Sequence, residues 1–140
     1  MPAFRADLAI RFRHCDPAGI VFYPRYVELL NDLVEDWFAA MDAPFERLIA
    51  QGLAVPMAAL EAQFDRPSRQ GETLAAWLAV ERVGRSSCRI NVELVGPDGE
   101  RRVMFRATMV FADMTEVRSE PWPIALREAM LGYTGEETAA

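Results

Sequence analysis

The sequence contains no lysine, and all 15 of its basic residues are arginines. A Schiff-base mechanism through a lysine amine is therefore excluded, whereas many guanidinium groups are available for bidentate phosphate binding. Acidic residues outnumber basic ones by 21 to 15, and the formal net charge is −6. This balance argues against a protein that binds nucleic acid nonspecifically.

The sequence also lacks the features of several other protein classes. No apolar run approaches the roughly 18 residues of a membrane span, and "MPAFRADLAI" has no basic segment followed by an apolar one, as a secretory signal would. The two cysteines, Cys15 and Cys88, form neither a disulfide framework nor a zinc spacing, and no P-loop or dinucleotide pattern occurs. We therefore expect a cytoplasmic protein with free thiols.

The 140 residues predict one domain, 1–140, with a small polar tail at about 135–140 that we expect to be flexible. "DLAIRFRH" alternates and predicts a strand whose Leu8, Ile10 and Phe12 share the core face. "YPRYVELLNDLVEDWFAAMD" carries apolar residues at 3–4 spacing and predicts a long helix, and "PFERLIAQG" predicts a short one that ends at Gly52.

The second half of the sequence has the period of two that is typical of strands. It predicts four strands, a hairpin turn at Gly96–Gly99 and a terminal helix; the strands cover 54–65, 72–83, 88–95 and 101–113, and the helix 121–131. Short connections between the strands favour antiparallel pairing. The long helix must bury its stripe on this sheet, so the sequence predicts an α+β fold with a curved sheet around one central helix. Edge strands that continue into a second subunit would favour a dimer.

The segment "HCDPAGIVFYP" joins the first strand to the long helix. Its Asp16-Pro17-Ala18-Gly19 matches a type I turn, in which the aspartate commonly bonds its own backbone. The flanking residues are apolar, and a carboxylate beside an apolar crevice can also act as a base or nucleophile. Both interpretations of Asp16 remain open on the sequence alone.

His14 and Cys15 suggest a nucleophile–base pair, but strand geometry opposes it. If the strand continues through them, adjacent side chains point to opposite faces and the two do not meet. His14 and Asp16 would share a face, so a His–Asp pair stays open, while Cys15 is expected to be a small packed residue.

Three further features are compatible with a binding site. The first N–H groups of the long helix have no intrahelical partners and can hold a developing oxyanion, although most such groups are simply capped or hydrated. Asn31 lies at the edge of the apolar stripe, where it would contact a ligand between helix and sheet or bond to a neighbouring strand. Arginines and serines around Gly84 could bind phosphate or could simply be solvated; they are Arg82, Arg85, Ser86, Ser87 and Arg89.

"FRHCDPAGIVFYPRY" resembles the signature of the hot-dog-fold acyl-CoA thioesterases, specifically the 4-hydroxybenzoyl-CoA thioesterase branch. The resemblance implies a hot-dog fold, with a curved antiparallel sheet of about five strands wrapped around one long central helix. It also implies homodimers or homotetramers with active sites at the subunit interface. No metal or redox cofactor is implied, since coenzyme A is part of the substrate.

The resemblance also implies roles for individual residues. Asp16 matches the catalytic carboxylate, acting as nucleophile or general base, and the backbone N–H of Tyr23 matches the oxyanion donor. Asn31 occupies the place of an aspartate that faces the substrate's phenol in the hydroxybenzoyl enzyme, and His14 stands where that enzyme has an acidic residue. In the related Tol–Pal-associated thioesterases a histidine follows the motif tyrosine, and Pro24 at that place favours the benzoyl-type branch. The implied substrate-binding residues are Pro24, Val27 and Asn31, and the implied CoA-binding residues are Arg82, Arg85 and Ser86.

The sequence thus predicts an acyl-CoA thioesterase that hydrolyses an aromatic or short-chain acyl-CoA to the acid and CoA. Two alternatives remain. A hydratase or dehydratase of the same fold would need His14 as its imidazole, and a non-catalytic acyl-CoA-binding protein would need no catalytic residue.

Overall fold

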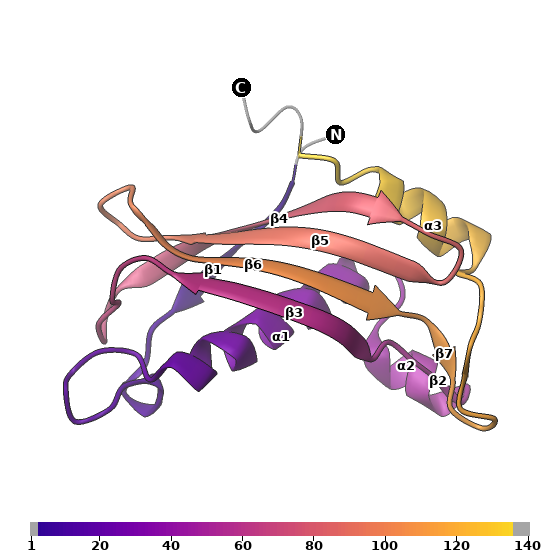
Figure 1. Cartoon of the computed structure of the whole chain (residues 1–140), viewed down its shortest axis with the longest axis horizontal. Helices are drawn as coiled ribbons and strands as arrows, with labels where there is room; N and C mark the ends of the chain where they lie inside the picture. Colours follow the sequence, from indigo (N-terminus) through magenta and orange to yellow (C-terminus); the bar gives the residue numbers. More distant parts are fainter. Residues whose placement is uncertain (1–2, 136–140) are drawn as a thin grey trace.

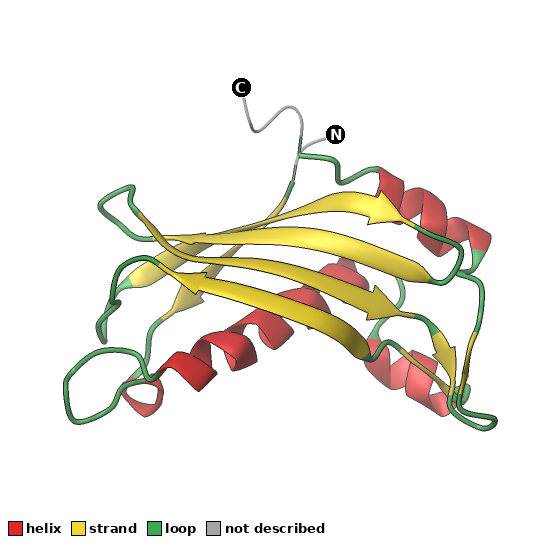
Figure 2. Ribbon diagram, in the orientation of Figure 1, coloured by secondary structure: helices red, strands yellow, loops and turns green. Residues whose placement is uncertain are grey.

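The computed structural model describes residues 3–135 and combines one large antiparallel sheet with three helices (Figures 1 and 2). The predicted tail at about 135–140 lies, apart from Gly135, outside the described residues. The large sheet has the order β1-β4-β5-β6-β3, and each neighbouring pair is antiparallel. Its strands are β1 (Phe4–Ala9), β3 (Met57–Phe64), β4 (Thr73–Val83), β5 (Ser87–Val95) and β6 (Arg101–Val110).

The remaining elements lie around this sheet. The helices are α1 (Tyr23–Ala40), α2 (Phe45–Ala50) and α3 (Ile124–Leu131), and a single 3-10 turn, η1, covers Phe12–His14. A small second sheet has the order β2-β7-β8 and consists of β2 (Leu53–Ala54), β7 (Ala112–Asp113) and β8 (Arg118–Ser119). Of the described helices, none is both long enough and apolar enough to cross a membrane.

The core lies between α1 and the sheet face that arches over it (Figure 1). Strand β5 alternates as predicted, with Cys88, Ile90, Val92 and Leu94 fully buried. The 3–4 spacing of α1 turns Leu30, Leu33, Trp37 and Phe38 toward the same core, at 0–1% exposure. Each such side chain contributes roughly 1.5–3 kcal/mol by burial. The α+β class and the antiparallel sheet are therefore confirmed, and the helices comprise the 18-residue α1 together with two shorter ones.

The first strand is shorter than the sequence predicts. We expected it to run through His14, but β1 ends at Ala9 and the chain tightens into η1. The His14 Nδ1 accepts the Arg11 N–H at 2.8 Å, and the His14 N–H donates to the Arg11 carbonyl at 3.0 Å, so side chain and backbone together close the turn. Phe12, which was expected on the core face, is consequently 78% exposed.

Strand alternation therefore does not separate His14 from Cys15. His14 belongs to the 3-10 turn, and Cys15 follows as its C-cap, where it forms an isolated bridge with Val21.

Candidate active site

Asp16 begins a tight turn at the tip of a short hairpin. The Gly19 N–H donates to the Asp16 carbonyl at 2.9 Å, which confirms the predicted turn, and Gly19 has a φ of +81° that a side chain would strain. The Asp16 Oδ1 accepts the Ala18 N–H at 2.9 Å. Among residues 3–135, no partner is found for its second oxygen, Oδ2. The backbone bond fixes the carboxylate while one oxygen stays available.

The hairpin is tied into the molecule at both ends. The Asp16 N–H donates to Ile20 at 3.0 Å, and the Phe22 N–H donates to His14 at 2.9 Å. The Val21 N–H donates to the carbonyl of Ser68 at 2.9 Å, which joins the hairpin to the loop between β3 and β4. These bonds hold the Asp16 turn directly beside the start of α1.

The start of α1 presents one free backbone donor. Pro24 has no N–H, and the Arg25 N–H donates to the Phe22 carbonyl at 2.8 Å. The Tyr23 N–H has no acceptor within the described part of the chain. It therefore lies unpaired at the positive end of the helix dipole, as an oxyanion donor must.

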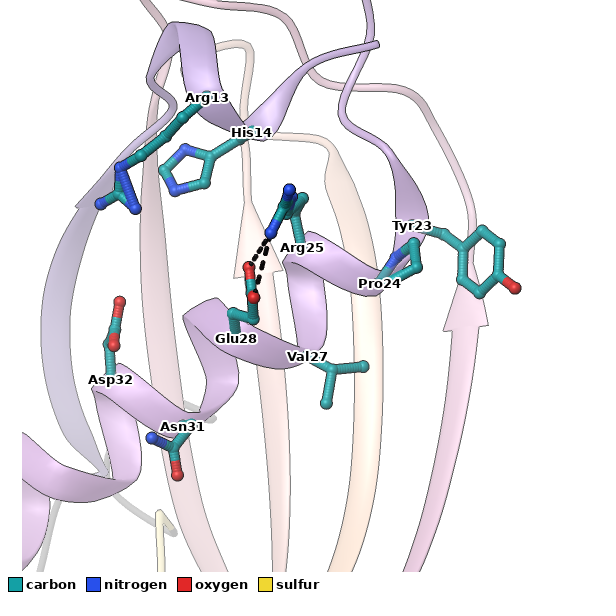
Figure 3. A pocket seen from close by; sticks show the side chains of 9 residues that line it. All are labelled: Arg13, His14, Tyr23, Pro24, Arg25, Val27, Glu28, Asn31 and Asp32. Carbon is teal, nitrogen blue, oxygen red and sulfur yellow. Dashed lines mark hydrogen bonds and ion pairs between the residues drawn. The ribbon is translucent and has the colours of Figure 1, made fainter.

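Two cavities meet at Tyr23. The first, which we call the Asp16 cavity, has a volume of about 470 Å³ and lies between the hairpin, α1 and the end of β3; its walls include Asp16, Tyr23, Phe64 and Arg66. The second, the helix-face cavity, has a volume of about 870 Å³ and lies on the exposed side of α1 (Figure 3). The predicted substrate-binding residues Pro24, Val27 and Asn31 line the second cavity. Tyr23 lines both cavities.

Asn31 lies on the solvent side of α1 and not between the helix and the sheet. It is exposed, and its Nδ2 lies 3.5 Å from the Glu35 Oε2 one turn further along. It does not bond to a neighbouring strand, so its amide is accessible to a ligand in the helix-face cavity.

His14 is only 3% exposed and lines the helix-face cavity, a placement that strand reasoning did not find. Because its Nδ1 accepts the Arg11 N–H, the proton of the neutral ring lies on Nε2. Burial lowers the pKa of His14 below its usual value, and the adjacent Arg13 charge lowers this pKa further. In this arrangement His14 is a hydrogen-bond donor toward the cavity and is not a base.

The predicted CoA-binding residues Arg82, Arg85 and Ser86 lie at the turn between β4 and β5. This turn packs at the far end of α1. The Trp122 N–H donates to the Arg85 carbonyl at 3.0 Å, and the Trp122 ring lies tilted against Phe38 with ring centroids 6.4 Å apart. Since an 18-residue helix is about 27 Å long, a single chain does not bring this turn to Asp16.

Two arginines that the sequence analysis did not select lie much closer to Asp16. Arg66 lines the Asp16 cavity and forms an ion pair with Glu100 at 3.5 Å. The Arg69 Nη1 would lie 3.7 Å from a Cβ placed on Gly19, so it borders the Asp16 turn. Only the loop pattern "DRPSRQG" signals them in the sequence.

Comparison with known proteins identifies the family. The family model of the thioesterase-like superfamily matches residues 10–130. The chain belongs to the thioesterase-like superfamily. This match includes the Asp16 turn, α1 and the five-stranded sheet apart from β1, and it confirms the expectation of a thioester hydrolase. A comparison with curated protein sequences finds no match.

Solved structures share the fold of this superfamily member over nearly its whole length. A 1,4-dihydroxy-2-naphthoyl-CoA thioesterase from Synechocystis is 17% identical with a TM-score of 0.86, over 92% of this chain and 96% of that one. A hypothetical protein from Staphylococcus aureus in complex with CoA is 12% identical with a TM-score of 0.88, over 95% and 85%. A thioesterase superfamily protein from Jannaschia sp. CCS1 is 24% identical with a TM-score of 0.85, over 94% and 93%. At these identities the likeness shows the fold alone.

Proposed function

We propose that the protein hydrolyses an acyl-CoA thioester, with an aromatic, benzoyl-type acyl group or a short one, as a hot-dog-fold enzyme of the 4-hydroxybenzoyl-CoA thioesterase branch. The observation that carries this proposal is that Asp16 and Tyr23, whose N–H is unpaired within the described residues, line one cavity. Superfamily membership supports the reaction type. The CoA complex of the Staphylococcus aureus protein and the naphthoyl-CoA thioesterase from Synechocystis support the substrate class.

The chemistry follows from these two groups. Asp16 either attacks the thioester carbonyl carbon or removes a proton from a water molecule that attacks it. The carbonyl oxygen gains negative charge and accepts the Tyr23 N–H at the positive end of α1. The C–S bond then breaks, and the CoA thiolate leaves and takes up a proton. Water supplies the second oxygen of the acid product, directly or by hydrolysis of an acyl-aspartyl intermediate.

The arrangement of His14 disfavours the hydratase alternative. A hydratase would need an imidazole nitrogen with a free lone pair to move a proton at the acyl chain. The only lone pair of the neutral His14 ring accepts the Arg11 N–H at 2.8 Å. Base chemistry by His14 would require this turn to open first.

The active enzyme is proposed to be a homo-oligomer, a dimer or tetramer, in which a second chain completes the CoA site. Strand β3 lies at a sheet edge, and all eight of its residues are exposed, including the apolar Leu60 and Phe64. A long, apolar, unprotected edge favours pairing with another copy. A partner would also provide what one chain does not, namely Arg82, Arg85 and Ser86 near the Asp16 cavity.

The edge hypothesis has a direct test in Ala62. The Asp65 N–H donates to the Arg102 carbonyl at 2.9 Å, so alternate residues from Asp65 bond to β6 and the N–H of Ala62 points outward. Ala62→Pro therefore removes an outward donor and spares the internal ladder. We expect its mass in solution to fall to that of a monomer, while the control Ala62→Ser stays associated. A wild-type protein that is already monomeric would contradict the hypothesis.

The function itself is tested with a panel of acyl-CoA esters and detection of the released thiol. Thiol release from aromatic or short acyl-CoA substrates is the expected result. Tight binding of these esters with no thiol released over hours would instead identify a non-catalytic acyl-CoA-binding protein.

A further inference from the structure

The unpaired nitrogen of His14 suggests a role beyond closing its own turn. The side chain is 97% buried, since its exposure is 3%, yet it forms part of the wall of the helix-face cavity. Its Nδ1 is occupied by the Arg11 N–H, and no acceptor within residues 3–135 takes the proton on Nε2. The His14 Nε2 is not among the fully buried, unpaired side-chain atoms of the described residues, which are the Tyr26 Oη, the Trp37 Nε1 and the Arg102 Nε. This donor therefore reaches the helix-face cavity, where a ligand or water can accept its proton.

The chemistry around His14 restricts what that ligand can be. His14 lies above the exposed side of α1, where Glu28 and Asp32 project toward the same space (Figure 3). Glu28 is already paired with Arg25 at 2.9 Å, whereas Asp32 has no partner in the described chain. A carboxylate on the ligand would face these negative charges. A hydroxyl can accept from His14 and donate to Asp32, so a neutral polar group fits this wall best.

The position along α1 fits an acyl group that starts at the proposed oxyanion donor. The Phe22 N–H donates to the His14 carbonyl at 2.9 Å, which places His14 beside the start of α1. His14 and Tyr23 line the same cavity. An acyl group whose carbonyl lies at the Tyr23 N–H can therefore extend along this cavity toward His14.

We propose that His14 is a specificity-determining residue, whose Nε2–H donates a hydrogen bond to a neutral acceptor atom, such as a hydroxyl, on the acyl group bound against α1. This inference rests on the proposed hydrolysis of acyl-CoA and assigns to His14 the selection of the acyl group. His14 acts as the donor, and Asp16 remains the residue that performs the reaction.

Two substitutions separate this role from the structural one. In His14→Asn the amide oxygen replaces Nδ1 as acceptor for the Arg11 N–H, while nothing replaces the Nε2–H donor. In His14→Gln the longer side chain places an amide N–H near the position of Nε2 and leaves the Arg11 N–H unpaired. The first variant therefore keeps the turn and loses the donor, and the second does the reverse.

The test compares benzoyl-CoA with 2-, 3- and 4-hydroxybenzoyl-CoA, using kcat/KM from thiol release and the melting temperature of each variant. We expect the wild type to prefer at least one hydroxylated ester. His14→Asn should lower that preference about 3- to 10-fold, the factor that corresponds to one neutral hydrogen bond, with a melting temperature near that of the wild type. His14→Gln should retain the preference and melt at a lower temperature.

Several outcomes would overturn the inference. These are a wild type without any preference for a hydroxylated ester, an unchanged preference in His14→Asn, and a parallel loss of activity on all four esters, which would indicate a purely structural role. Should the wild type release no thiol at all, the proposed hydrolysis fails. The same preference measured from dissociation constants of the intact esters would then still test the donor role of His14.

Discussion

Replacement of Arg102 should strongly destabilise the protein, because its side chain is a buried charge with several partners. Its side chain is 5% exposed and forms a bidentate pair with Glu72, at 2.9 and 3.0 Å. It also donates to the Pro67 carbonyl at 3.0 Å and to the Ser68 Oγ at 3.2 Å. These bonds hold the loop whose Ser68 carbonyl anchors the Asp16 hairpin through Val21. Loss of Arg102 should therefore destabilise the fold on the side that carries the candidate site.

The size of the effect follows from what Arg102→Met leaves behind. Methionine fills a similar volume but leaves the Glu72 carboxylate, 26% exposed, without its counter-ion. Breaking a buried pair in this way costs about 3–5 kcal/mol, and the partial exposure of Glu72 favours the lower value. For a chain of this size, about 3 kcal/mol corresponds to a decrease of about 10 °C in melting temperature.

The assay is urea and thermal unfolding, with Arg106→Met as the matched control. Arg106 lies on the same strand and also pairs bidentately, with Glu81 at 2.7 and 3.2 Å, but the two side chains are 42% and 33% exposed. Solvent screens such a pair, so we expect a much smaller decrease. Adding Glu72→Gln to Arg102→Met should restore part of the stability. Equal destabilisation by the two arginine variants would refute the reasoning.

Three further predictions concern other positions. Gly96→Ala should lower the melting temperature, because a Cβ at Gly96 would overlap the Arg102 guanidinium. Gly99→Ala serves as the comparison: a Cβ there contacts nothing, but φ is +82°, so the variant measures the effect of backbone strain alone. The hydrogen bond from Arg102 lowers the pKa of Glu72 below its usual 4.5. The ionised Glu72 carboxylate therefore stabilises the fold fully above pH 4.5, and this stabilisation is lost as the pH falls through the lowered pKa. The difference in unfolding free energy between wild type and Glu72→Gln should therefore shrink in acid. Burial raises the pKa of Cys88 to about 12, so a thiol reagent at neutral pH should label Cys15 well before Cys88, as peptide mapping would show.

Local patterns in the sequence were sufficient to predict most of the fold. The apolar stripe of α1 and the alternation of β5 reflect which residues face the core, and the spacing of apolar residues in the sequence shows this directly. The hairpin at Gly96–Gly99 depends on turn residues and is closed by the Gly99 N–H to the Gly96 carbonyl at 2.9 Å. The end of β1 was not predicted correctly. The Arg11 N–H donates to the His14 side chain, and this bond competes with the strand that the alternating pattern predicts.

The candidate site was predictable only in part. The Asp16 turn and the start of α1 are adjacent in sequence, so their proximity follows from the motif. Whether Arg82 and Arg85 approach Asp16 depends on the path of the sheet, which places their turn at the opposite end of α1. Arg69 approaches Gly19 through a loop 50 positions away, and no local pattern contains that information.

The central claim is that the Asp16 carboxylate performs the reaction, and Asp16→Asn tests it most directly. An asparagine Oδ1 can still accept the Ala18 N–H, so the turn is preserved while the charge is lost. Asp113→Asn is the matched control, because the Asp113 Oδ1 accepts the Thr115 N–H at 2.9 Å in the same local geometry, away from both cavities. With acyl-CoA substrates and thiol detection, we expect Asp16→Asn to lose about 10²-fold or more in kcat, while Asp113→Asn stays close to the wild type. Hydrolysis by Asp16→Asn at the wild-type rate would contradict the account.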